Sequence, residues 1–62
     1  MRTEIILMRK ERDGGSVVIS VHDYFVPLEI GDLVMGKNGK PFTIEAKEFD
    51  CKHETIRIYV EE

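Results

Sequence analysis

Apolar and polar residues alternate along most of the chain, with the two-residue period of a β-strand and not the longer period of a helix. Glycine, proline, asparagine and aspartate interrupt this alternation about every eight to twelve residues, a spacing typical of small β-barrels and sandwiches. The pattern therefore predicts an all-β domain built from short strands.

The N-terminal third of the chain is predicted to form a β-hairpin. Its first strand covers Glu4–Lys10, where the apolar run Ile5–Met8 indicates partial burial on both faces. The stretch Asp13–Ser16 supplies glycines that tolerate positive φ, which favours a turn into a second strand over Val17–Tyr24. A bulge at these glycines would shift the pairing by one residue, so the sequence leaves the register open. The second strand is expected to direct Val17, Ile19 and Val21 into the core.

The segment Phe25–Asp32 is predicted to be a connection and not a central strand. Pro27 has no N–H to donate to a sheet, and Gly31 permits a tight bend before the next strand. Phe25 is expected to pack in the core.

A second hairpin is predicted over Leu33–Ala46. Asn38-Gly39 is the preferred pair for a two-residue type I′ turn, which would place Lys37 opposite Lys40. In that register Met35 lies opposite Phe42 and Leu33 opposite Ile44, so these four apolar side chains share one face.

The last strand is predicted over Glu54–Glu61, after a five-residue loop at Phe49–His53. This loop length places Glu45 across from Arg57 on the outer face, where opposite charges attract weakly. It also pairs Ala46 with Ile56, Ile44 with Ile58 and Phe42 with Val60.

The five predicted strands share one core. The fold class expected is a small five-stranded antiparallel barrel or a strongly twisted sheet, formed by residues 1–62 as a single domain. Besides the three residues of the second strand, the predicted core consists of Leu33, Met35, Phe42, Ile44, Ala46, Ile56, Ile58 and Val60.

One part of the chain resembles a known family. The stretch Leu28–Val34 with its Gly-Asp-Leu-Val, a following Gly-Lys turn, and the strand beginning Pro41–Ile44 resemble small Src-homology-3-like barrels over about half of the chain. Barrels of this type mostly bind peptides, protein surfaces or nucleic acids, so the resemblance implies a binding role. The aromatic and acidic clusters with which such barrels bind proline-rich ligands are not matched here, and no binding residue is carried over.

Cysteine content and hydropathy bear on the compartment. The chain has one cysteine, Cys51, so it cannot form a disulfide within itself, and a cytoplasmic location is the simpler expectation. The apolar run Ile5–Met8 is followed at once by Arg9 and Lys10 and is too short for a membrane span.

The charge balance argues against most nucleic-acid binders, which are usually basic. Nine Lys and Arg residues against twelve Asp and Glu residues give a net charge of −3. Nucleic acid nevertheless stays the alternative partner, because an acidic protein can carry a local basic patch. The residues that would form it are Arg2, Arg9, Lys10, Arg12 and Lys37.

Candidate chemistry is sparse. Asp50, Cys51, His53 and the distant His22 are suitable zinc ligands, but structural zinc sites usually need paired ligands at regular spacing. Cys51 with His53 as a nucleophile and base would lack a third, orienting group. We therefore expect no metal, no cofactor and no enzymatic activity.

The remaining candidates are residues for binding another protein. Tyr24 and Tyr59 fall on the non-core face by alternation, and tyrosine is enriched at binding hot spots. Carboxylates such as Glu45 would steer a basic partner. The sequence favours a protein-interaction module, with a small stand-alone regulator or inhibitor from a bacterium or bacteriophage as the form envisaged. A structural subunit of a homo-oligomer is the third hypothesis.

Overall fold

The computed structural model describes residues 1–8, 15–36 and 39–61, and within these ranges it contains strands and no helix. The predicted all-β fold is therefore confirmed, and the described part of the chain offers no helix that could cross a membrane. The strands are β1 (Arg2–Met8), β2 (Ser16–His22), β3 (Leu33–Met35), β4 (Pro41–Asp50) and β5 (Thr55–Glu61).

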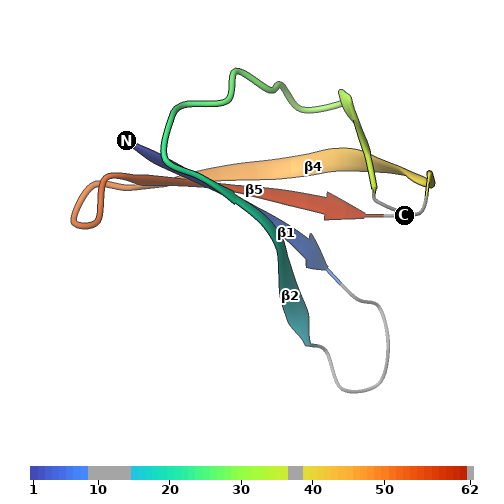
Figure 1. Cartoon of the computed structure of the whole chain (residues 1–62), viewed down its shortest axis with the longest axis horizontal. Coiled ribbons are helices and arrows are strands. Elements are labelled where there is room, and N and C mark those ends of the chain that lie inside the picture. The colour runs from blue at the N-terminus through green and yellow to red at the C-terminus, as the bar shows by residue number, and fades with distance from the viewer. Residues whose placement is uncertain (9–14, 37–38, 62) are drawn as a thin grey trace.

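The five strands form one curled sheet in the order β2-β1-β5-β4-β3, which has the shape of a half-barrel (Figure 1). The expectation of a purely antiparallel sheet is wrong, because β1 and β5 lie parallel, with Ile5 opposite Ile58. Side chains alternate with the same period in parallel and antiparallel strands, so the apolar pattern could not distinguish the two.

The register of β1 and β2 changes at a bulge inside β2. Ile5 pairs with Ser20, but Ile6 pairs with Val18, so Ile19 is an extra residue in β2. Ile19 packs against the core as predicted. The prediction for Val17 and Val21 is wrong, since both are exposed. Val21 lies opposite Glu4, on the face away from Ile5. Val17 lies near the start of β2, an edge strand that pairs only with β1 among the described residues.

The β3–β4 hairpin is shifted by one residue from the predicted register. Val34 pairs with Phe42, and the backbone N–H of Gly36 donates to the carbonyl of Lys40. Three residues therefore separate this pair, where a two-residue turn was predicted; Lys37 and Asn38 lie outside the described residues. A slip of one residue turns each side chain to the other face. Leu33 and Met35 are consequently 65% and 66% exposed, which corrects their assignment to the core.

The β4–β5 pairing also differs from the prediction. β4 continues to Asp50, which pairs with Thr55, so the turn has four residues, 51–54, in place of the five expected. Arg57 therefore lies opposite Glu48 and not opposite Glu45. Glu45 is the extra residue at a bulge between the pairs formed by Ile44 and Ala46. The bulge directs Ala46 outward, opposite Tyr59, so Ala46 is exposed and its core assignment is wrong.

The core occupies the concave face of the sheet, and its most buried members lie on the central strands. The buried cluster consists of Ile5, Phe42, Ile44, Ile58 and Val60. Four of these were predicted as core, and Ile56, also predicted, packs partly buried against the cluster.

The connection between β2 and β3 runs alongside β4 (Figure 1). Its start is fixed by the buried Thr3, whose Oγ1 donates to the carbonyl of Tyr24 and accepts from the N–H of Val26. Its end joins β4 through the N–H of Gly31, which donates to the carbonyl of Ile44. Phe25 in this connection is half exposed, so its predicted burial is wrong.

Candidate functional site

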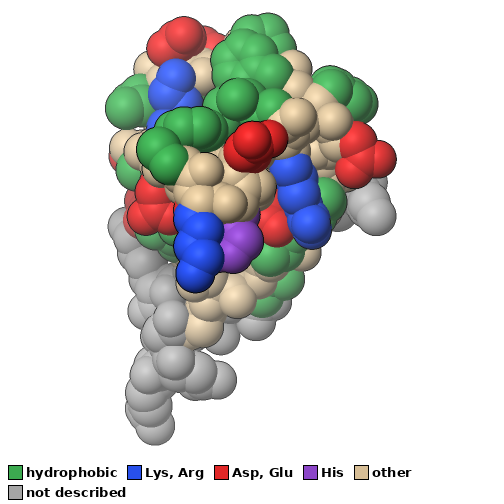
Figure 2. Space-filling model, turned by 90° about the vertical axis from the view of Figure 1, so that its left-hand side faces the viewer, with side chains coloured by type: hydrophobic (Ala, Val, Ile, Leu, Met, Phe, Trp, Pro, Cys, Tyr) green, Lys and Arg blue, Asp and Glu red, His purple; other side chains and the backbone are tan. Residues whose placement is uncertain are grey.

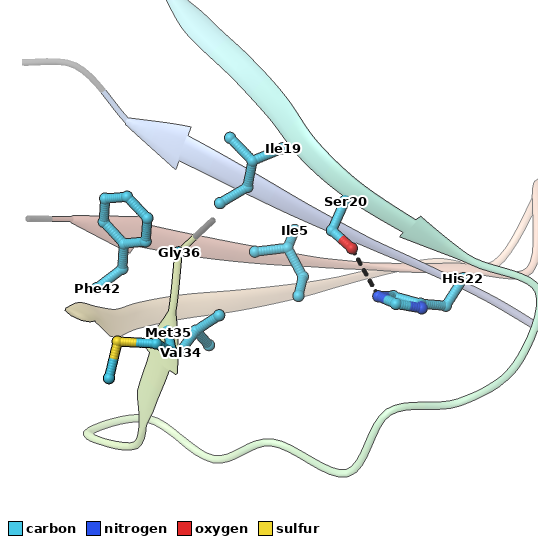
Figure 3. Close-up of a pocket in the computed structure, with 8 residues that line it drawn as sticks. All are labelled: Ile5, Ile19, Ser20, His22, Val34, Met35, Gly36 and Phe42. Atoms are coloured by element: carbon cyan, nitrogen blue, oxygen red, sulfur yellow. Dashed lines mark hydrogen bonds between the residues drawn. The ribbon is translucent and has the colours of Figure 1, made fainter. Parts of the chain in front are cut away.

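The half-barrel is open between its two edge strands, β2 and β3. A cleft of about 590 Å³ lies between them, and the side chains of the core form its floor (Figure 3). The residues that line this cleft are Ile5, Ile19, Ser20, His22, Val34, Met35, Gly36 and Phe42.

The lining of the cleft follows from the strand registers. The bulge in β2 turns two successive residues, Ile19 and Ser20, toward the cleft from one side. The one-residue shift of the other hairpin brings Val34 inward from the opposite side. β3 has three residues and β2 has seven, and the two form the opposite edges of the sheet.

Ser20 and His22 form the polar part of this otherwise apolar cleft. They lie two residues apart on one strand and so share a face, and the Oγ of Ser20 is 2.7 Å from the Nε2 of His22 (Figure 3). The ring of Tyr24 contacts the ring of His22, with 5.3 Å between the ring centroids. None of the lining residues is a carboxylate, so the pair offers one hydroxyl and one imidazole to a bound group.

The edge formed by β2 lacks the residues that usually carry charge on edge strands. Ser16–His22 contains no Lys, Arg, Asp, Glu or Pro, and Val18 is 51% exposed. Natural edge strands are usually short or carry lysine or proline, which discourages pairing with other chains. A bulge is another such protection, and β2 has one at Ile19.

A second hollow of about 460 Å³ lies between the β2–β3 connection and the strands β4 and β5. Met1, Phe25 and Phe49 are half-exposed parts of its lining. Lys47 lines the same hollow, and its Nζ donates to the carbonyl of Leu28. The sequence did not indicate this hollow, because Phe49 was assigned to a loop.

A network of charges covers the outer face near the β4–β5 turn. Arg57 contacts three carboxylates, with distances of 3.0 Å to Glu48, 3.0 Å to Asp50 and 3.5 Å to Glu4. Oδ2 of Asp50, which accepts from Arg57, also lies 2.7 Å from Nδ1 of His53. The hydrogen bonds from His53 and then Arg57 hold the pKa of Asp50 well below its usual range. The hydrogen bonds that Arg57 donates to Asp50 and then to Glu48 raise the pKa of Arg57.

This network shapes the turn. Oδ1 of Asp50 accepts the backbone N–H groups of Lys52 and His53, and Glu54 completes the reversal with a φ of 49°. Figure 2 shows the end of the molecule that carries this turn, where basic and acidic side chains are interspersed around a histidine. The Asp50 cluster is therefore explained by the structure of the turn.

The structure separates the residues predicted to bind a protein partner. Tyr24 is largely exposed and lies beside His22, one of the residues that line the cleft. Tyr59 lies on the outer face, where its hydroxyl donates to Glu48 over 3.4 Å. Glu45 is exposed at the β4 bulge.

The other predicted candidates lie apart from the cleft. Arg2 forms an ion pair with Glu4, and the rest of the basic patch, Arg9, Lys10, Arg12 and Lys37, lies outside the described residues. Cys51 is an exposed free thiol in the β4–β5 turn. Within the ranges that the structure describes, no three His, Cys, Asp or Glu side chains are grouped to hold a metal ion.

Sequence reasoning missed the cleft because it placed the wrong face of β3 inward. Alternation with Val17, Ile19 and Val21 placed Ser20 and His22 on the outer face, and the bulge at Ile19, which no sequence pattern marked, turns them inward. Comparisons of the chain with protein-family models, curated proteins and solved structures found no match, so its function is inferred from the geometry of this surface.

Proposed function

We propose that this chain is a non-enzymatic protein-interaction module that binds a segment of a larger partner in the cleft between β2 and β3. The observation that carries the proposal is that the sheet curls around its core but leaves an apolar cleft between two unpaired edges. Covering apolar surface contributes about 25 cal/mol per Å². Filling the cleft with apolar side chains of a partner therefore contributes favourable binding free energy, and it also shields the open side of the core from water.

The resemblance to Src-homology-3-like barrels supports the same role, because such barrels mostly act as recognition modules. In this proposal the chain acts in the cytoplasm as a small regulator or inhibitor of bacterial or bacteriophage origin. Its contact with the partner is small, so a few side chains supply most of the affinity.

Tyr24 is the predicted hot-spot residue that fits this contact. Its exposed ring lies at the end of the cleft marked by His22, where it can bury a flat apolar surface and keep its hydroxyl hydrogen-bonded. Tyr59 and Glu45 lie outside the contact proposed here.

Two substitutions on β3 test the proposal. Met35 lines the cleft and Leu33 does not, yet the two side chains are almost equally exposed and lie on the same strand. Affinity capture from the native host's lysate would identify the partner, and titration calorimetry would then measure its binding to each variant. We expect Met35→Glu to weaken binding at least tenfold and the control Leu33→Glu to leave it nearly unchanged. Equal effects of the two substitutions would contradict the proposed site.

A further inference from the structure

We propose that the segment bound in the cleft is an extended strand that pairs with the outer edge of β2, with apolar residues at alternate positions and Lys or Arg between them. This inference rests on the proposed function and names the chemistry of its partner. The occupant proposed is a strand of another protein, and a second copy of this chain is the alternative that the test below distinguishes.

The two edges of the sheet differ in their capacity to pair. β2 is seven residues long and β3 is three residues long. Main-chain hydrogen bonds supply the affinity in strand addition, so the longer edge offers more of it. The described residues show β2 paired with β1 alone. The bulge at Ile19 interrupts this edge, but its sequence lacks the lysine or proline that would discourage a further strand.

The position of the cleft fixes the side-chain pattern of the added strand. Ile19, Ser20 and His22 turn toward the cleft from β2, so a strand beside β2 would lie over the same space. Every second side chain of that strand would enter the cleft and meet Val34 and Phe42 from the other side. These positions must be apolar, because the lining offers one hydroxyl and one imidazole as polar partners.

Charge complementarity determines which residue types suit the other positions of the added strand, whose side chains point away from the cleft. The chain has a net charge of −3, which attracts basic segments and repels acidic ones. Asp23 directly follows β2, is exposed, and forms no ion pair within the described part of the chain. A Lys or Arg at the end of the added strand would lie beside this carboxylate.

A set of synthetic peptides tests the pairing directly. The probe is a seven-residue peptide of alternating lysine and valine with blocked ends. Two matched peptides carry N-methyl groups, one on every valine nitrogen and the other on every lysine nitrogen. In a strand that pairs along one edge, alternate N–H groups face the neighbouring strand. We therefore expect one N-methylated peptide to lose at least tenfold in affinity and the other to bind as the parent does.

The controls separate this inference from the proposed function. A glutamate-valine peptide should bind at least tenfold more weakly than the lysine-valine peptide, and amide shifts on binding should be largest in β2. Equal behaviour of the two N-methylated peptides, or no binding of the parent, would overturn strand addition. If the natural partner still depends on Met35 in that case, the proposed function stands and this inference alone fails. A dimer in light scattering that Val18→Lys dissociates would overturn the choice of occupant.

Discussion

Truncation of Ile58 is expected to destabilise the fold strongly, whereas the same truncation at Leu33 is not. Both residues belong to the core in the register that the sequence predicts. In the structure Ile58 is completely buried on the central strand β5, and Leu33 is 65% exposed on the edge strand β3. The pair of alanine variants therefore distinguishes the two registers.

The sizes of the two effects follow from burial. Ile58→Ala removes three buried carbon atoms, worth about 0.8 kcal/mol each in transfer, and leaves a cavity, so the total cost is about 2–5 kcal/mol. Roughly a third of the surface of Leu33 is buried, so Leu33→Ala should lower the free energy of unfolding by about 0.8 kcal/mol on the same scale. A domain of this length is stable by roughly 3–9 kcal/mol, so the first change removes a large part of the total.

Urea unfolding of both variants and the wild-type protein, followed by far-ultraviolet circular dichroism, measures the difference. Thermal melts should agree, with the midpoint of Ile58→Ala lower by at least about 8 °C, since each kcal/mol shifts the midpoint of so small a domain by roughly 4–8 °C. Equal losses in the two variants would refute the register of β3 and β4 described above.

Two further predictions concern the charge network on the outer face. Because the pKa of Asp50 is lowered in the folded state, its carboxylate stabilises the fold above the unfolded-state pKa of about 3.9, and this contribution is lost as the pH falls toward the folded-state pKa. Asp50→Asn should therefore lower the urea midpoint at pH 7, and the difference from wild type should shrink below about pH 4; a constant difference down to pH 2 would contradict the cause given. Double-mutant cycles should show a coupling between Glu48 and Arg57 and none between Glu45 and Arg57, and the reverse result would restore the register with the five-residue loop.

The fold class could be predicted from the sequence because it depends on period alone. Alternating residues in β5 placed Ile58 and Val60 in the core, and both are buried. The register between paired strands depends on β-bulges, each of which inserts a single residue into one strand. The alternation of apolar and polar residues does not reveal where a bulge lies. The bulges at Ile19 and Glu45 each shift one ladder by a residue, and their positions carry no glycine that would have marked them.

The candidate site could be predicted less well, because it is a cleft between two edge strands and depends on which strands are neighbours in the sheet. No local pattern shows that β1 pairs in parallel with β5, and that pairing makes β2 and β3 the edges. Tyr24 was identified by its alternation and lies beside the cleft. Met35 was assigned to the core for its apolar character, whereas it lies at the edge of the cleft and is largely exposed.

Amide hydrogen exchange, measured residue by residue by NMR, tests most directly whether the half-barrel is open along β2. A strand with one neighbour protects alternate N–H groups, while a strand between two neighbours protects nearly all of them. The open half-barrel predicts alternating fast and slow exchange along Ser16–His22 and slow exchange throughout the middle of β5. Uniformly slow exchange along β2 in the free monomer would show that its outer edge is already paired and would contradict the proposed site.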